Sequence, residues 1–221
     1  MIIPAVIPTS RHHLDVTLES LSTFSEHVQV DVVDGSFAPV ASWPYKEETD
    51  IRDTLGALTF DSMEVGLDLM IQSPEDTLEL WRETHAARII VHVESTNKLA
   101  TILSHASHHS YKLGLAFNND TNLDLLSDID RYGVDFVQLM GIATIGEQGL
   151  PFDDRVVERI KTVKEKFPDM IVSIDGGVKE ETLPLLRDAG ADWFVSGSAI
   201  LRAENPEAAY HTLSNLAVAN I

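Results

Sequence analysis

Eight short apolar runs alternate with helical patterns along all 221 residues of the chain. A strand that is followed by a helix and then by another strand builds a parallel sheet, because the helix returns the chain to the same end of the sheet. Eight such units over about 220 residues match the count of a (β/α)8 barrel. The sequence therefore predicts an α/β fold, a single (β/α)8 TIM barrel, with one domain over residues 1–221. The strands are expected to begin near residues 2, 27, 63, 88, 111, 134, 170 and 192.

The clearest of these units is the stretch IVSIDGGVKEETLPLLRDAGADWFVSGSAI at residues 171–200. Its first strand ends at Gly176 and Gly177, and its second strand ends at Gly197 and Ser198. Glycines at a strand end expose backbone N–H groups in front of a helix, where they can bind a phosphate. The same glycines could simply turn the chain, and the residues alone leave both interpretations open.

Two of the intervals between strands are longer than the others. Most intervals contain about 22 to 25 residues, whereas those that start at the second and sixth strands contain about 36. The additional residues form predicted loops at 34–47 and 141–153, which follow the carboxyl ends of strands. Barrels place active sites at this face, and long loops in compact domains often cover binding sites. Helices are expected at residues 14–24, 74–84, 97–106 and 154–167.

The charge and the missing cysteines exclude several classes of function. The net charge is −19, from 16 Lys and Arg against 35 Asp and Glu. A general surface for nucleic acid or for an anionic membrane is therefore not expected. The chain contains no cysteine, which excludes disulfides, thiolate metal sites and a cysteine nucleophile.

The amino-terminal segment MIIPAVIPTS is apolar, but it contains Pro4 and Pro8 and no basic leader. This pattern indicates a strand rather than a signal peptide. No apolar run approaches the length of a membrane span. We therefore expect no membrane segment and a cytoplasmic protein.

Alternation along the strands predicts polar side chains inside the barrel. A barrel interior normally contains Val, Ile and Leu, and a buried carboxylate without a partner is costly. Three carboxylates, those of Asp31, Asp68 and Asp175, are expected at one barrel mouth. Their repulsion requires a cation, a protonated member or intervening water. The inward-facing set also contains Gln29, Glu64, Gly66, Met70, Ile90, His92, Glu94, Phe136, Gln138, Met140, Ile171 and Ser173.

Seven short segments occur in the order of the strand ends of a known family. They are VDVVDGSFAP, LDLMI, VHVE, GLAFNNDT, VQLM, DGGV and SGSAI. In this order they resemble the ends of strands two to eight in the ribulose-phosphate 3-epimerases, a family of ribulose-phosphate-binding barrels. The resemblance extends over nearly the whole chain and implies the same barrel fold.

The resemblance also implies an activity and a set of site residues. It implies a sugar-phosphate epimerase, an isomerase that inverts carbon 3 of a ketose phosphate through an enediolate. Asp31 and Asp175 would be the acid and the base on opposite sides of the sugar. A divalent metal held by Gln29, Asp31, Asp68 and Asp175 would stabilise the enediolate. The substrate- and phosphate-binding residues would be Met70, Met140, Gly146, Gly176, Gly177, Gly197 and Ser198.

The sequence departs from the family at two metal positions where histidine is expected. Gln29 and Asp68 occupy these positions, so the set offers mainly oxygen, which favours magnesium or manganese over zinc or iron, or no ion at all. Pro8 stands in place of a substrate-contacting serine. The segment GIATIGEQGLPF at 141–152 lacks the family pattern PGFGGQ, although Gly146 could still approach an anion.

Two alternatives to the 3-epimerase stay open. One is a related isomerase or lyase that acts on another sugar phosphate, and the other is a non-catalytic sugar-phosphate-binding barrel. No lysine falls at a predicted strand end inside the barrel, which argues against Schiff-base aldolases. The Asp-x-Lys-x-x-Asp pattern of sugar-phosphate decarboxylases and hexulose-phosphate synthases is absent.

The expected partner is a small-molecule ketose phosphate, and the resemblance favours a homo-oligomer. The sequence does not name the sugar. Nor does it assign a role to His12, His13, His92 or Trp43.

Overall fold

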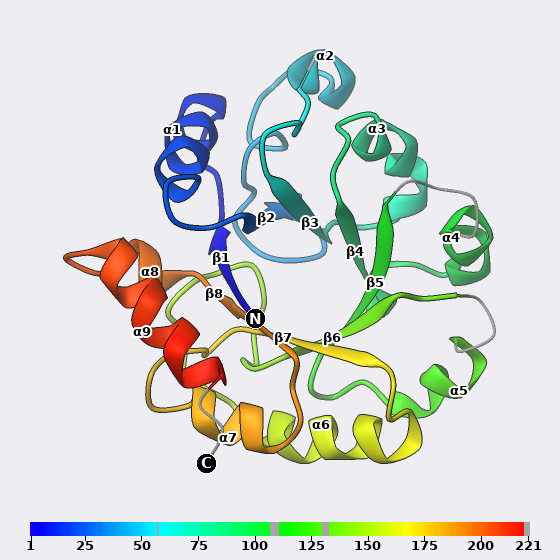
Figure 1. Cartoon of the computed structure of the whole chain (residues 1–221). Coiled ribbons are helices and arrows are strands. Elements are labelled where there is room, and N and C mark those ends of the chain that lie inside the picture. Colours follow the sequence, from blue (N-terminus) through cyan, green and yellow to red (C-terminus); the bar gives the residue numbers. More distant parts are fainter. Residues whose placement is uncertain (57, 107–110, 130–132, 219–221) are drawn as a thin grey trace.

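The chain forms a closed barrel of eight parallel strands surrounded by helices (Figure 1). This computed structural model describes residues 1–56, 58–106, 111–129 and 133–218. Each strand begins within two residues of its predicted start, so the predicted (β/α)8 barrel is confirmed. The strands are β1 Ile2–Val6, β2 His27–Val33, β3 Glu64–Met70, β4 Arg88–His92, β5 Lys112–Phe117, β6 Phe136–Met140, β7 Ile171–Asp175 and β8 Trp193–Ser196.

Helices form the outer layer, and two of the predicted helices differ from those observed. The first helix begins at Arg11, three residues before its predicted start, because the Ser10 side chain accepts a hydrogen bond from the backbone N–H of His13 and caps it. The helix predicted over 74–84 is divided at Thr77, where the backbone leaves helical geometry. The helices are α1 Arg11–Leu21, α2 Ile51–Leu55, α3 Leu78–Arg82, α4 Leu99–Ala106, α5 Leu126–Ile129, α6 Arg155–Lys166, α7 Leu183–Asp188, α8 Ser198–Leu201 and α9 Pro206–Val218, with 3-10 turns η1 Pro74–Asp76, η2 Val93–Ser95 and η3 Leu123–Leu125.

The strand register brings the acidic residues to one end of the barrel. β2 and β3 pair over seven residues, and this pairing places Asp31 directly beside Asp68. On the other side of the barrel, β6 and β7 pair so that Met140 lies beside Asp175. Since all the strands run in the same direction, these residues meet near the carboxyl ends, the face where barrels carry their active sites.

The main apolar core lies between the strands and the outer helices, and the barrel interior is filled separately. Inside the barrel, Ile90, Ala116 and Phe136 form an apolar cluster against which Trp193 packs. Gly114 leaves room for the Phe136 ring, because a Cβ at this glycine would lie 2.3 Å from the ring. Phe136 is one inward position before Gln138 on β6, so this filling lies on the amino-terminal side of the polar residues.

The two long loops lie where they were predicted, after β2 and β6. Asp34 orders the first loop, because its carboxylate accepts hydrogen bonds from the backbone N–H groups of Ser36, Phe37 and Gln72. Gly146 of the second loop packs against the first loop, since a Cβ at this glycine would lie 2.9 Å from the Ala38 side chain. The loops therefore support each other above the barrel mouth.

Among the described residues, none of the helices combines the length and the apolar character needed to cross a bilayer.

Candidate active site

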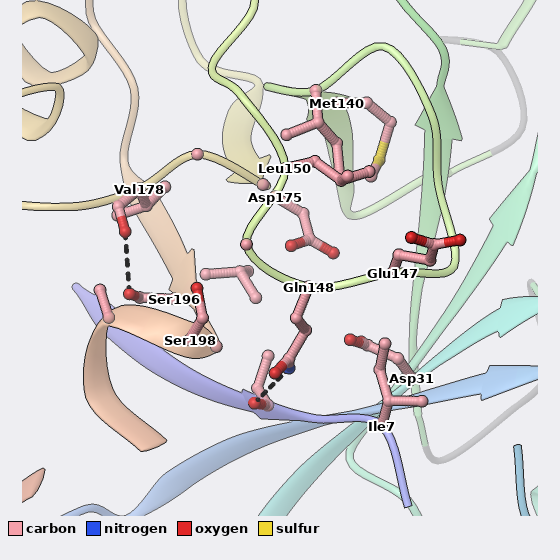
Figure 2. Close-up of a pocket in the computed structure, with 18 of the residues that line it drawn as sticks. Ile7, Asp31, Met140, Glu147, Gln148, Leu150, Asp175, Val178, Ser196 and Ser198 are labelled. Atoms are coloured by element: carbon pink, nitrogen blue, oxygen red, sulfur yellow. Dashed lines mark hydrogen bonds between the residues drawn. The ribbon is translucent and has the colours of Figure 1, made fainter. Parts of the chain in front are cut away.

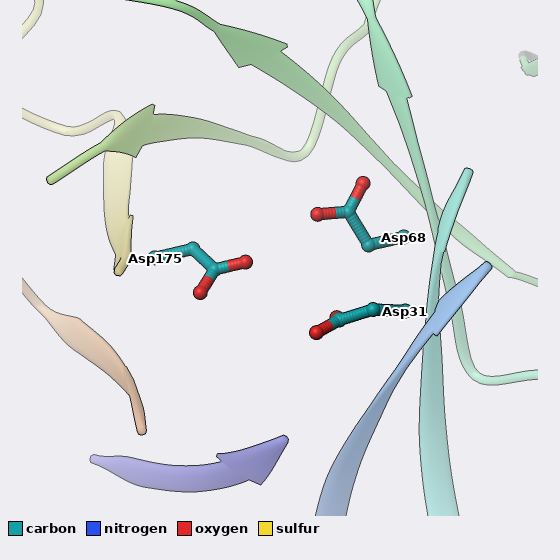
Figure 3. Close-up of side chains that lie close together, drawn as sticks. All are labelled: Asp31, Asp68 and Asp175. Atoms are coloured by element: carbon teal, nitrogen blue, oxygen red, sulfur yellow. The ribbon is translucent and has the colours of Figure 1, made fainter. Parts of the chain in front are cut away.

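Three buried carboxylates converge at the carboxyl end of the barrel, as the sequence predicted (Figure 3). Asp31 comes from β2, Asp68 from β3 and Asp175 from β7. Each offers one oxygen, and these three oxygens lie within 4.8 Å of one another. Such a group of like charges needs compensation, because burial and mutual repulsion both disfavour the ionised forms.

Part of the compensation comes from the side-chain amide of Gln29. Its nitrogen donates to Asp31 Oδ1 at 2.9 Å and to Asp175 Oδ2 at 2.8 Å. One amide thus joins the two carboxylates that were predicted to act as acid and base. The assignment of Gln29 as a metal ligand stays a prediction, and it requires the amide to turn its oxygen towards the ion.

A second amide, that of Gln138 on β6, makes a similar bridge. Its nitrogen donates to Asp68 Oδ2 at 2.8 Å and lies 3.5 Å from Asp175 Oδ2. Alternation had placed Gln138 on the inward face without a role. The sequence contains a signal for this residue, because glutamine is the only polar residue in the strand FVQLM at 136–140. The sequence does not identify the hydrogen-bond partners of the amide.

Positive charge for the group comes from His92, which is fully buried on β4. Its Nε2 lies 3.2 Å from Asp68 Oδ1, and its Nδ1 lies 3.8 Å from Glu94 Oε2. Burial disfavours charge on the ring, but Asp68 and Glu94 outweigh this effect and raise the pKa of His92 to about 9. The imidazole is therefore charged at neutral pH and offsets one carboxylate.

The remaining carboxylates have raised proton affinity. Burial, followed by repulsion from Asp175 and Asp68, raises the pKa of Asp31 well above its ordinary value. Burial and then repulsion from Asp68 raise the pKa of Asp175 to about 7. Asp175 can therefore take up and release a proton near neutral pH, and Asp31 holds a proton more readily than an ordinary aspartate. Raised proton affinity of this kind is expected of acid and base catalysts.

A cavity of about 300 Å³ opens above the carboxylates at the carboxyl-terminal face. Asp31 and Asp175 both contribute to its wall, and Figure 2 shows their carboxylates pointing into it. Gln29 and Asp68 are not among its lining residues. All seven residues that were predicted to bind substrate or phosphate line it: Met70, Met140, Gly146, Gly176, Gly177, Gly197 and Ser198.

Two glycines after β7 have a conformation that other residues rarely adopt. Gly176 and Gly177 have φ values of 94° and 69°. A Cβ at Gly176 would lie 2.7 Å from the Ile142 side chain, and one at Gly177 would lie 2.8 Å from the Phe152 ring. The turn therefore requires glycine both for its dihedral angles and for its close packing.

The cavity lining also contains residues that were not predicted, among them three with long polar side chains. Glu147 and Gln148 come from the loop after β6, and Lys179 follows the glycines after β7. The Gln148 amide nitrogen donates to the backbone oxygen of Ala5 at 3.1 Å, across the cavity mouth (Figure 2). Periodicity cannot reveal such residues, because loops have none.

The structure also describes the residues that the sequence left without a role. His13 accepts a hydrogen bond from the backbone N–H of Thr9 through Nδ1, at 3.1 Å, and Pro8 accepts one from the Trp43 backbone. Trp43 is buried in the main core, so it neither covers the cavity nor offers an exposed contact surface. Neither His12 nor His13 lines the cavity.

The residues present fit a hard divalent cation. The carboxylates of Asp31, Asp68 and Asp175 supply only oxygen, and their separation allows one ion to contact all three. Oxygen ligands of this kind suit magnesium, manganese or calcium. The amides of Gln29 and Gln138 compete for the same oxygens, so the group is compensated in part without an ion.

Comparison with known proteins decides the family. A profile described as "Ribulose-phosphate 3 epimerase family" matches residues 1–201. The chain belongs to this family. It is 31% identical over 190 residues to ribulose-phosphate 3-epimerase from Aquifex aeolicus, covering 84% of this chain and 82% of the relative. It is 28% identical over 187 residues to ribulose-phosphate 3-epimerase from Chlamydia pneumoniae, covering 82% of this chain and 78% of that protein.

Membership of the ribulose-phosphate 3-epimerase family makes the chain a sugar-phosphate epimerase, an enzyme of the isomerase class, as predicted. Among solved structures, it is similar to 3-keto-L-gulonate-6-phosphate decarboxylase from Vibrio cholerae, with a TM-score of 0.72 and 14% identity. That alignment covers 98% of this chain and 96% of the other. Identity this low supports the barrel fold and carries no information about the reaction.

Proposed function

We propose that the protein epimerises carbon 3 of a ketose phosphate, such as ribulose 5-phosphate, by moving protons through two carboxyl groups. The main support is that Asp31 and Asp175 line one cavity from β2 and β7. One carboxylate removes the proton from carbon 3, and the electron pair moves into an enediolate. The other group, as a carboxylic acid, returns a proton to the opposite face. The raised pKa values of both groups support their role in proton transfer.

The substrate's phosphate is proposed to bind the backbone N–H groups of Gly176, Gly177, Gly197 and Ser198. These four residues line the same cavity as the two aspartates, so the sugar can extend from one group to the other. Lys179 lines the same cavity and adds a positive charge. Phosphate or sulfate bound at the amino-terminal end of the barrel instead would contradict this assignment.

A divalent ion, when bound, would be held by Asp31, Asp68 and Asp175, and it would stabilise the negative charge of the enediolate. We expect magnesium or manganese, held weakly, rather than zinc or iron. Elemental analysis of protein purified without added metal tests this expectation. Zinc or iron at one ion per chain would contradict it.

Proton NMR of ribulose 5-phosphate in D2O separates the possible activities. The proposal predicts that solvent deuterium enters carbon 3 and that the carbon-3 epimer appears. Exchange at carbon 1 alone would instead support a related isomerase. Phosphate binding without exchange in any ketose phosphate would support a non-catalytic binding protein and would overturn the proposal.

Two further expectations rest on the family. A homo-oligomer and a cytoplasmic location both stay predictions, which size-exclusion chromatography with light scattering and cell fractionation respectively would test.

A further inference from the structure

A buried glutamine amide in the middle of a barrel interior needs a chemical reason. Gln138 is fully buried, and the inward position before it on β6 is occupied by Phe136 within an apolar cluster. An apolar residue here would extend that cluster. A primary amide has two N–H donors and one strong acceptor, all of which need partners when they are buried.

The partners of Gln138 lie on two other strands. Its nitrogen donates to Asp68 on β3, across the barrel, at 2.8 Å, and it lies 3.5 Å from Asp175 Oδ2 on β7. Its oxygen lies 3.5 Å from the hydroxyl of Ser173, which can donate to it. This set of partners fixes the orientation of the amide, because ionised carboxylates only accept hydrogen bonds.

The same Asp175 oxygen also accepts a hydrogen bond from the Gln29 amide nitrogen at 2.8 Å. Oδ2 of Asp175 thus lies within hydrogen-bond distance of one amide from β2 and one from β6. Two donors on one oxygen restrict the rotation of the carboxylate. They hold it in a constant position relative to Asp68 and Asp31.

We propose that Gln138 is a positioning residue of this active site, whose amide holds Asp175 and Asp68 in the arrangement that proton transfer at carbon 3 requires. This inference rests on the proposed function. Gln138 does not line the cavity, so it acts through the aspartates and does not contact the substrate.

The test compares Gln138→Met with Gln72→Met. Methionine keeps the approximate length of glutamine but has no N–H donor. Gln72 is the matched control, because its amide donates to the Ser95 backbone oxygen, away from the three aspartates. In metal sites, removal of a group that hydrogen-bonds to a ligand residue typically costs about 10- to 100-fold in metal affinity or activity. We expect a fall of that size in kcat with KM unchanged for Gln138→Met, and wild-type values for Gln72→Met.

The pH profile separates positioning from a purely structural role. Without the amide donors the ionised carboxylates are less favoured, so the acid limb of the kcat profile should move to higher pH in Gln138→Met. In Gln138→Glu the new side chain donates only when it is protonated. The activity of this variant relative to wild type should therefore rise as the pH falls. Wild-type kcat and pH profile in either folded variant would overturn the proposal.

Carbon-13 NMR of the aspartate carboxyl groups keeps the proposal testable apart from turnover. The Asp175 carboxyl should titrate at higher pH in Gln138→Met than in wild type, even if wild type acts on no ketose phosphate. Absence of wild-type exchange would count against the proposed function alone. Unchanged aspartate titration in a folded Gln138→Met protein would count against the role of Gln138.

Discussion

At the scale of single residues, the site depends on how the two aspartates share protons. Asp31 and Asp175 have raised pKa values for the same reasons, namely burial and neighbouring negative charge. His92 is charged beside Asp68, which limits the total negative charge of the group. Each carboxyl group therefore holds a proton more readily than an ordinary aspartate, as proton transfer in both directions requires.

Removal of either aspartate should stop the reaction without unfolding the protein. General acid and base groups contribute about 10²- to 10⁴-fold, so we expect kcat losses of this size in Asp31→Asn and Asp175→Asn. Asp169→Asn is a suitable control, because Asp169 is exposed and lies just before the other end of β7. A wild-type rate of carbon-3 exchange in Asp175→Asn would contradict the two-base mechanism.

The raised pKa of Asp175 also predicts how stability depends on pH. The folded protein binds this proton more tightly than the unfolded chain, because the folded pKa of about 7 exceeds the ordinary value of 3.8. Its contribution to stability is thus fully present below about pH 4 and is lost as the pH rises through about 7. Asparagine does not ionise, so the Asp175→Asn variant does not lose this contribution to stability as the pH rises. Its melting temperature should exceed that of wild type above pH 7, and the difference should shrink towards pH 4.

The size of that effect is bounded by the pKa shift. Each pKa unit corresponds to about 1.4 kcal/mol, so the gain in unfolding free energy amounts to a few kcal/mol at most. Thermal unfolding followed by circular dichroism at a series of pH values measures it. A pH-independent difference between variant and wild type would show that Asp175 does not carry the linked proton.

At the scale of elements, the loops after β7 and β8 determine the proposed phosphate site. Gly177→Ala should weaken phosphate binding and destabilise the fold by about 1–3 kcal/mol, because φ is 69° and a Cβ would meet Phe152 at 2.8 Å. Titration calorimetry with inorganic phosphate and thermal unfolding measure the two effects.

Gly133→Ala is the matched control for this experiment. Gly133 also has a positive φ, of 71°, but a Cβ there would meet no atom within 4 Å. This variant therefore carries the dihedral strain without the collision. It should bind phosphate like wild type, and an equal loss of binding in both variants would contradict the proposed site.

The strands and the positions of the carboxylates could be predicted because side chains alternate between the two faces of a strand. Alternation placed Asp31, Asp68 and Asp175 on the inward face, and the shared direction of the strands brought them to one end. The partners of Gln138 could not be predicted, because they depend on side-chain rotamers across the barrel. Gln148 lies in a loop without periodicity. The start of α1 was missed because the Ser10 cap precedes the apolar stripe.

At the scale of the whole molecule, the net charge of −19 repels an anionic substrate. Screening reduces this repulsion, and the Debye length shortens from about 30 Å at 0.01 M salt to about 8 Å at 0.15 M. We therefore expect kcat/KM for a ketose phosphate to rise as salt increases over this range. Steady-state kinetics in sodium chloride measures it. A fall in kcat/KM would show that local positive charge, such as that of Lys179, dominates the encounter.

The central claim, proton transfer by two different carboxyl groups, makes a direct isotopic prediction. In D2O, the proton removed from one face of ribulose 5-phosphate cannot be the one that is added to the other face. Xylulose 5-phosphate formed in the first turnovers should therefore carry deuterium at carbon 3, as mass spectrometry of the quenched reaction would reveal. Product that retains the substrate's own proton at carbon 3 would contradict the two-base account.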